Sequence, residues 1–167
     1  VFGVEVPLAM GAALLNSGNG TLSEAVQLQG VHILADLRKK AVDFGALHFS
    51  SIATEVYRKA TNGEEYLQRI RDIGIPCTLI SQLQEAKLGF ESVASQEHSS
   101  GDPCVWDSGG ASFQISSRNL SLDNFQLNTY MGSVGTSITT SILVKEIYLR
   151  DLKSIVTVNP VTADDAS

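Results

Sequence analysis

The sequence predicts an α/β protein in which parallel strands are joined by crossover helices. Between residues 21 and 95, apolar residues recur at helical spacing in three segments. Short strand-like runs at residues 47–53 and 75–80 separate those segments. Strands that alternate with helices pair in parallel, and the helices form the crossovers. After Pro103, short strands follow one another through polar turns, which favours antiparallel pairing and makes the predicted sheet mixed.

The starts of the three helices are marked by Thr, Asn or Ser followed three positions later by Glu or Gln. This spacing is typical of a capping box, in which the first side chain and the fourth satisfy free backbone N–H groups of the first turn. The three signatures lie at residues 21–24, 62–65 and 81–84. With the glycines that can end a helix, they predict helices over residues 21–45, 62–74 and 81–95.

The two ends of the chain complete the predicted order of elements. A strand is expected over residues 1–6, before the first helix. Later strands are expected at residues 104–106, 113–117 and 124–130, followed by a helix from residue 136 to about residue 155.

Composition limits the functions that the chain can serve. Its 167 residues are enough for one domain or two small lobes. The net charge is -6 and no Arg-rich stretch occurs, so duplex nucleic acid is not an expected partner. Nor is a membrane, because no apolar run reaches the roughly 18 residues that span a bilayer. An acidic protein that binds polyanions needs backbone amides, placed cations or a metal.

The stretch from Cys104 to Ile115 is the candidate for phosphate chemistry. A strand ends at Asp107, a run of small residues turns the chain, and a second strand leaves after Ser112. Such a turn lets several backbone N–H groups approach a phosphate, because Gly and Ala add little bulk. Ser112 adds a hydroxyl donor, and Asp107 could hold Mg²⁺ directly or through water. The structural alternative is a plain β-hairpin with a Gly-rich turn.

The segment from Asp107 to Gln114 resembles the Asp-Ile-Gly-Gly-Gly-Ser-Thr-Glu phosphate loop of the exopolyphosphatase / guanosine pentaphosphate phosphatase family. Residues 51–67 are similar to the family's strand, Arg and helix block, and residues 80–90 to its Ile-Ser-Gly-x-Glu-Glu-Ala-Arg-Leu helix start. Residues 130–134 are similar to its later Gly loop. The resemblance implies a ribonuclease H-like, actin-like ATPase fold, incomplete at both ends.

The resemblance also implies an organisation in two lobes. Residues 1–97 would form the C-terminal part of the first actin-like lobe, and residues 98–167 the start of the second, with the phosphate loop. The family opens with an Asp-x-Gly-Ser-Asn loop that nothing in residues 1–20 matches. We therefore expect a partial chain or a degenerate paralogue. A cytoplasmic location and a homodimer are further expectations from the family.

The resemblance assigns roles to single residues. Glu85 takes the place of the catalytic carboxylate that orients the attacking water, and Arg58 that of an arginine that binds phosphate with its planar fork. The alternatives are a solvated Glu and a surface Arg. Asp107 takes the position of the Mg²⁺ ligand. The phosphate-binding positions fall on Asp107, Gly109, Gly110 and Ser112, with Gly132 and Ser133 as a second patch of backbone donors.

The implied activity is Mg²⁺-dependent release of terminal phosphate from polyphosphate or guanosine pentaphosphate. This reaction needs a positioned phosphoryl group, charge neutralisation and a placed water. The alternative is a non-catalytic module that binds phosphate or a nucleotide and keeps the fold. The unmatched Asp-x-Gly-Ser-Asn loop favours this alternative, and so do two departures from the family's phosphate loop: its third Gly is Ala111 and its Glu is Gln114, a poor Mg²⁺ ligand. A sugar-kinase-like relative and a plain α/β domain are further interpretations.

Overall fold

A computed structural model of the chain describes residues 3–95, 103–118 and 126–147. None of the helices in these ranges is long and apolar enough to cross a membrane. In chain order the helices are α1 (Met10–Asn16), α2 (Glu24–Asp43), α3 (Glu55–Lys59), α4 (Gly63–Asp72), α5 (Gln82–Ala94) and α6 (Thr136–Ile142), which a π-helical turn continues (η1, Leu143–Ile147).

The strands form two sheets, so the parallel and antiparallel pairs predicted for one mixed sheet are separated. One is a parallel pair and the other is antiparallel with its strands in chain order. The strands are β1 (Ser51–Ala53) and β2 (Cys77–Leu79) in the parallel pair, and β3 (Cys104–Ser108), β4 (Phe113–Arg118) and β5 (Leu127–Gly132) in the antiparallel sheet. The predicted α/β class is confirmed.

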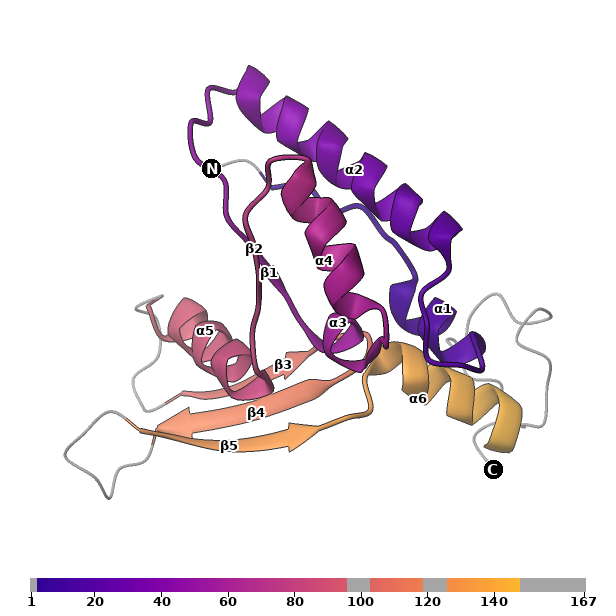
Figure 1. The fold of residues 1–167 in the computed structure, drawn as a ribbon. Helices are drawn as coiled ribbons and strands as arrows, with labels where there is room; N and C mark the ends of the chain where they lie inside the picture. Colours follow the sequence, from indigo (N-terminus) through magenta and orange to yellow (C-terminus); the bar gives the residue numbers. More distant parts are fainter. Residues whose placement is uncertain (1–2, 96–102, 119–125, 148–167) are drawn as a thin grey trace.

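Helices α3, α4 and α5 connect the strands and pack against the two sheets. β1 and β2 are joined through α3 and α4, which form the crossover that the sequence pattern predicts. α4 packs between this pair and the long helix α2, and α5 lies across one face of the antiparallel sheet (Figure 1). The two sheets are thus connected through α5, which follows β2 directly in the chain.

One of the three predicted capping boxes is confirmed, at the start of α5. The Gln84 amide donates to Ser81 Oγ at 3.2 Å, and the Ser81 amide donates to Gln84 Oε1 at 2.8 Å. Each side chain therefore satisfies a backbone N–H group of the first helical turn. This start is local in sequence, which is why the pattern alone predicts it.

The other two predicted capping boxes are wrong, because long-range or neighbouring contacts use the side chains. α2 begins after Ser23, whose hydroxyl accepts from the amide three residues on, and not after Thr21. The Thr21 hydroxyl instead donates to Asn19 Oδ1 at 2.6 Å. The side chain of Asn62 bonds the backbone N–H and carbonyl of Leu22, at 2.9 and 2.8 Å, and so does not cap α4.

The ends of the chain depart further from the pattern. No strand forms over residues 3–6, where Val4 and Val6 are exposed, and α1 follows instead, which the pattern did not predict. A strand needs a hydrogen-bonding partner, and no described segment supplies one. Of the strand and helix predicted near the C-terminus, the described part of the strand forms β5 from Leu127, and the helix begins as α6 at Thr136. Residues 124–125 and 148–155, also predicted for them, lie outside the described residues.

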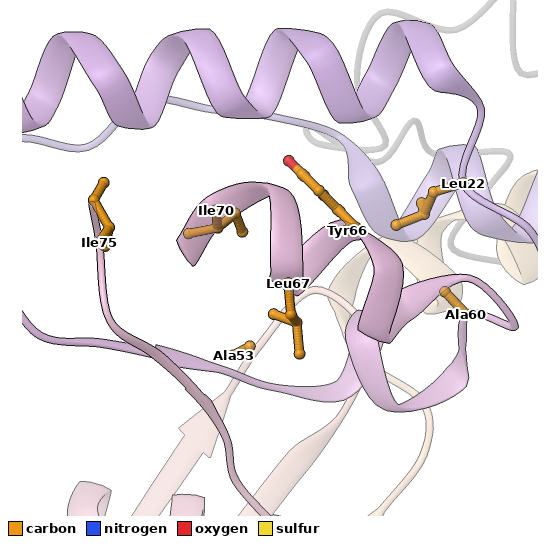
Figure 2. Packing of buried hydrophobic residues seen from close by; sticks show 7 residues of the cluster. All are labelled: Leu22, Ala53, Ala60, Tyr66, Leu67, Ile70 and Ile75. Carbon is orange, nitrogen blue, oxygen red and sulfur yellow. The ribbon is translucent and has the colours of Figure 1, made fainter. Parts of the chain in front are cut away.

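A buried cluster holds α4 against α2 and β1. Tyr66 and Leu67 of α4 are fully buried, and Figure 2 shows the Tyr66 hydroxyl directed towards α2. The Tyr66 hydroxyl lies against Gly30 of α2, so closely that a Cβ on Gly30 would overlap it. The cluster consists of Leu22, Ala53, Ala60, Tyr66, Leu67, Ile70 and Ile75.

The turn between β3 and β4, residues 109–112, is held by the start of α6. A hydrogen bond of 2.9 Å between its first amide and its last carbonyl closes the turn. The amides of Thr136 and Ser137 donate to the carbonyls of the turn's first two residues, at 3.0 Å each. Gly135 permits this approach, because a Cβ there would overlap the backbone of the turn.

Replacing Gly30 by Ala is expected to destabilise the protein by about 1–3 kcal/mol, because the added methyl group overpacks the core against Tyr66. The higher helix propensity of Ala acts in the opposite direction by up to about 1 kcal/mol. Urea unfolding of Gly30→Ala, with and without Tyr66→Phe, measures the effect. The Phe change removes the overlapping hydroxyl and should restore part of the lost stability; equal losses in both backgrounds would contradict the packing.

Replacing Gly135 by Ala is expected to lower the unfolding free energy by a similar amount, about 1–3 kcal/mol, and to displace the turn at residues 109–112. The new Cβ would meet backbone atoms, which cannot rotate away as a side chain can. Gly3→Ala is the matched control, since nothing lies within 4 Å of its added Cβ. Thermal unfolding midpoints that are equal for the two variants would exclude the close approach.

Candidate active site

Arg58, in the last turn of α3, connects α3 to the start of α5. Its Nη2 donates to Glu55 Oε2 at 2.8 Å and to Glu85 Oε2 at 3.0 Å, and its Nε donates to Glu55 Oε2 at 3.2 Å. Its Nη1 donates to the Ile80 carbonyl at 2.6 Å. The side chain is only 19% exposed. The guanidinium is therefore fixed by two carboxylates and one carbonyl, and it is not the free surface arginine of the alternative interpretation.

Glu55, in the first turn of α3, is a buried carboxylate between two cations. Its Oε2 binds Arg58, and its Oε1 binds Lys59 Nζ at 2.6 Å. Burial by itself raises the pKa of the Glu55 carboxyl, but the hydrogen bonds and charges of Lys59 and Arg58 outweigh it, so the pKa lies below its usual value. Glu55 thus carries a negative charge at neutral pH.

Glu85 is presented by the first turn of α5, and its side chain is 17% exposed. The partial positive charge at a helix N-terminus favours a carboxylate in this position. The same turn is tied to the antiparallel sheet, because Gln82 Nε2 donates to the carbonyls of Phe113 (3.3 Å) and Gly132 (3.1 Å). The position of Glu85 relative to the sheet is therefore set by its own helix start.

A cavity of about 240 Å³ brings Glu55 and Glu85 together with the turn at residues 109–112. Ser112 in this turn is 3% exposed. Within the described ranges, the amides of Gly110 and Ala111 donate to no acceptor. Free backbone N–H groups beside a cavity are suited to bind an anion. The remaining lining comes from residues 8–11, Thr54, Val56 and Ser137.

The predicted site residues fall into two groups. Glu85, Gly109, Gly110 and Ser112 line this cavity, and Arg58 contacts the two carboxylates that line it. Asp107, Gly132 and Ser133 are not among the lining residues.

The second group has other contacts. The Asp107 carboxylate lies against Gly89 of α5. The Gly132 carbonyl accepts from Gln82, and the Ser133 carbonyl accepts from Lys59 Nζ at 3.4 Å. These contacts use the carbonyls of Gly132 and Ser133, whereas the predicted role uses their amides. The phosphate roles of all three residues stay predictions.

Asp107 is the residue to examine for a metal ion. In the described part of the chain, no three His, Cys, Asp or Glu side chains gather as a metal site. Opposite Asp107 across the β3–β4 pair lies Gln114, which is 1% exposed and whose Nε2 donates to no acceptor in that part. Mg²⁺ commonly binds one or two carboxylates together with water and substrate phosphates. One carboxylate could suffice for such a site, but Asp107 does not line the cavity and the neutral Gln114 adds no charge, so the metal role of Asp107 stays a prediction.

Sequence reasoning missed Glu55 and the segment at residues 8–11. Glu55 precedes Arg58 and Lys59 by three and four positions, a spacing that brings opposite charges together on a helix. That signal was available in the sequence. For residues 8–11 no such signal exists, since their place in the cavity depends on the packing of α1 against α3 and α6.

Comparison with known proteins shows the family to which the chain belongs. A family model described as the Ppx/GppA phosphatase family matches residues 5–145. The guanosine-5'-triphosphate,3'-diphosphate pyrophosphatase of Vibrio vulnificus is 34% identical over 105 residues, which are 62% of this chain and 21% of that protein. The chain therefore spans about a fifth of this curated relative.

Two solved structures show the same fold. A Ppx/GppA family member from Aquifex aeolicus matches with a TM-score of 0.65 and 24% identity, over 83% of this chain and 44% of its own. An exopolyphosphatase from Cytophaga hutchinsonii matches with a TM-score of 0.63 and 19% identity, over 74% and 39%. The predicted actin-like fold is thus confirmed, over less than half of either structure. With the match to the family model, the conclusion is that this chain belongs to the Ppx/GppA phosphatase family.

Proposed function

We propose that the chain carries a phosphoanhydride hydrolase site, which releases terminal phosphate from polyphosphate or from a phosphorylated guanine nucleotide. One observation carries the proposal: Arg58 bonds Glu85, which lines a cavity whose other wall is the small-residue turn. A cation, free backbone amides and a carboxylate are the groups that phosphoryl transfer needs around one phosphate.

In the proposed reaction, a terminal phosphoryl group enters the cavity between Arg58 and residues 109–112. The amides of the turn and the Ser112 hydroxyl donate to its oxygens, and Arg58 neutralises its charge. Glu85 orients a water molecule towards phosphorus and takes its proton as the water oxygen bonds phosphorus. The bridging P–O bond breaks, and the shortened substrate leaves with the bridging oxygen. Because phosphoryl transfer demands little covalent chemistry of the protein, this positioning supplies most of the catalysis.

Asp107 would hold Mg²⁺, which when bound neutralises charge on the phosphates of the substrate. Gly132 and Ser133 would contribute amides to a more distant phosphate of an extended substrate. The division into lobes at residues 97 and 98, a homodimer and a cytoplasmic location belong to the same proposal. Membership of the family supports them.

A non-catalytic phosphate-binding module is the second candidate. It is favoured by Gln114, a buried neutral side chain where the related loop carries a Glu. Such a module would keep the anion contacts of Arg58 and the turn, and bind phosphate without turnover.

Replacing Glu85 by Gln is expected to lower Mg²⁺-dependent phosphate release at least about 100-fold, the usual contribution of a positioned base. The amide keeps the size of the side chain but no longer accepts a proton. Release of inorganic phosphate from polyphosphate and from guanosine pentaphosphate is the measurement. Glu91→Gln, an exposed position on the same helix, is the matched control and should leave the rate unchanged.

Equal rates in Glu85→Gln and the unsubstituted protein would contradict the role of Glu85. If the unsubstituted protein releases no phosphate, yet phosphate raises its unfolding temperature, the binding module is the correct function. The two candidates are therefore separated by one pair of measurements.

A further inference from the structure

We infer that Glu55 is a positioning residue, which holds one side of the Arg58 guanidinium so that an incoming phosphate displaces Glu85 from the other. The inference rests on the proposed function. It assigns a role to a residue for which the family resemblance gives none, and it explains how Arg58 can serve a substrate although it is already paired in the free protein.

The hydrogen bonds of Arg58 leave one end of the guanidinium open to exchange. The group has five N–H donors. Glu55 Oε2 accepts two of them, from Nε and Nη2, and the Ile80 carbonyl accepts one from Nη1. Glu85 takes the second donor of Nη2, and the second donor of Nη1 has no acceptor in the described residues. A phosphate in place of Glu85 would accept from the Nη2 donor that Glu85 leaves, and Nη1 keeps one further donor; such a fixed fork of donors is what favours arginine for phosphate.

The contacts of the two carboxylates indicate which one stays. Glu55 lies on the same helix as Arg58 and also binds Lys59 Nζ with its second oxygen. Its side chain is 11% exposed. Glu85 comes from another helix, is 17% exposed, and has Arg58 as its one ion-pair partner within the described residues. Displacement of Glu85 breaks one bond to Arg58, whereas displacement of Glu55 breaks two and also uncovers Lys59.

The charges around Arg58 predict how loss of the Glu55 charge changes phosphate affinity and turnover. Glu55 and Glu85 balance Arg58 and Lys59, so an entering phosphate meets a site with no net charge. Loss of the Glu55 charge leaves the site positive and strengthens binding of any anion. Loss of the anchor also lets Arg58 leave the orientation that the reacting phosphoryl group needs while its charge stays beside the anion, which lowers the rate of the chemical step. Affinity and turnover therefore change in opposite directions.

The test compares Glu55→Gln, Glu55→Asp and Glu24→Gln in the whole protein. Glu24 is the matched control, because it is 72% exposed and pairs with Arg69 at 3.2 Å. Calorimetry gives the Kd of inorganic phosphate, and polyphosphate hydrolysis gives kcat and KM. In Glu55→Gln we expect phosphate to bind roughly three- to tenfold more tightly and kcat to fall at least about tenfold.

The conservative variant separates positioning from folding. Glu55→Asp restores the charge on a shorter side chain, so its phosphate Kd should match the unsubstituted protein while kcat recovers in part. Glu24→Gln should change neither quantity. Weaker phosphate binding together with lower kcat in Glu55→Gln would show that Glu55 only supports the fold, and would overturn the inference. If urea shows that Glu55→Gln is unfolded, unchanged kcat and Kd in Glu55→Asp would overturn it.

Failure of the proposed function gives a different result. A protein that binds phosphate but releases none is not a hydrolase, yet the Kd comparison still decides the role of Glu55. Tighter binding in Glu55→Gln then supports it, and an unchanged Kd overturns it. An unsubstituted protein that binds no phosphate overturns both.

Discussion

The site depends on the hydrogen bonds that Arg58 makes to Glu55, Glu85 and the Ile80 carbonyl. A guanidinium removed from water is costly unless its donors are satisfied, and here the acceptors come from α3, α5 and the residue after β2. The two helices must therefore keep a fixed relative position. The buried cluster fixes the position of α3, because Leu67 and Tyr66 hold α4 beside β1 and α3 connects β1 to α4 in the chain.

On the other side, α5 couples the carboxylate to the phosphate-binding turn. The capping box that starts α5 sets the first turn on which Glu85 lies, and Gln82 ties this turn to the antiparallel sheet. The sheet in turn carries residues 109–112, which the first amides of α6 hold in place. The carboxylates that hold Arg58 and a set of free amides thus line one cavity, although Glu55 and the turn are about fifty residues apart in the chain.

The sequence predicts contacts between neighbouring residues and misses contacts between segments that are far apart in the chain. The start of α5 depends on Ser81 and Gln84 alone, so the pattern is sufficient there. Asn62 begins an equally good capping signature, but its side chain bonds the backbone of Leu22 in a distant segment and so does not cap α4. The resemblance assigns Arg58 and Glu85 to one site; the two side chains form an ion pair, and their roles stay predictions. The anchoring carboxylate, Glu55, was missed because its spacing is common to many solvated helix faces.

In the proposed site, Arg58 and the turn at residues 109–112 bind one phosphate between them. Anomalous diffraction from crystals soaked in tungstate, a tetrahedral oxyanion like phosphate, tests this most directly. We expect a tungsten atom in the cavity beside Glu85, with its oxygens about 3 Å from Arg58 and the turn amides, and Glu85 released from Arg58. Tungstate bound elsewhere, with Arg58 still paired to Glu85, would contradict it.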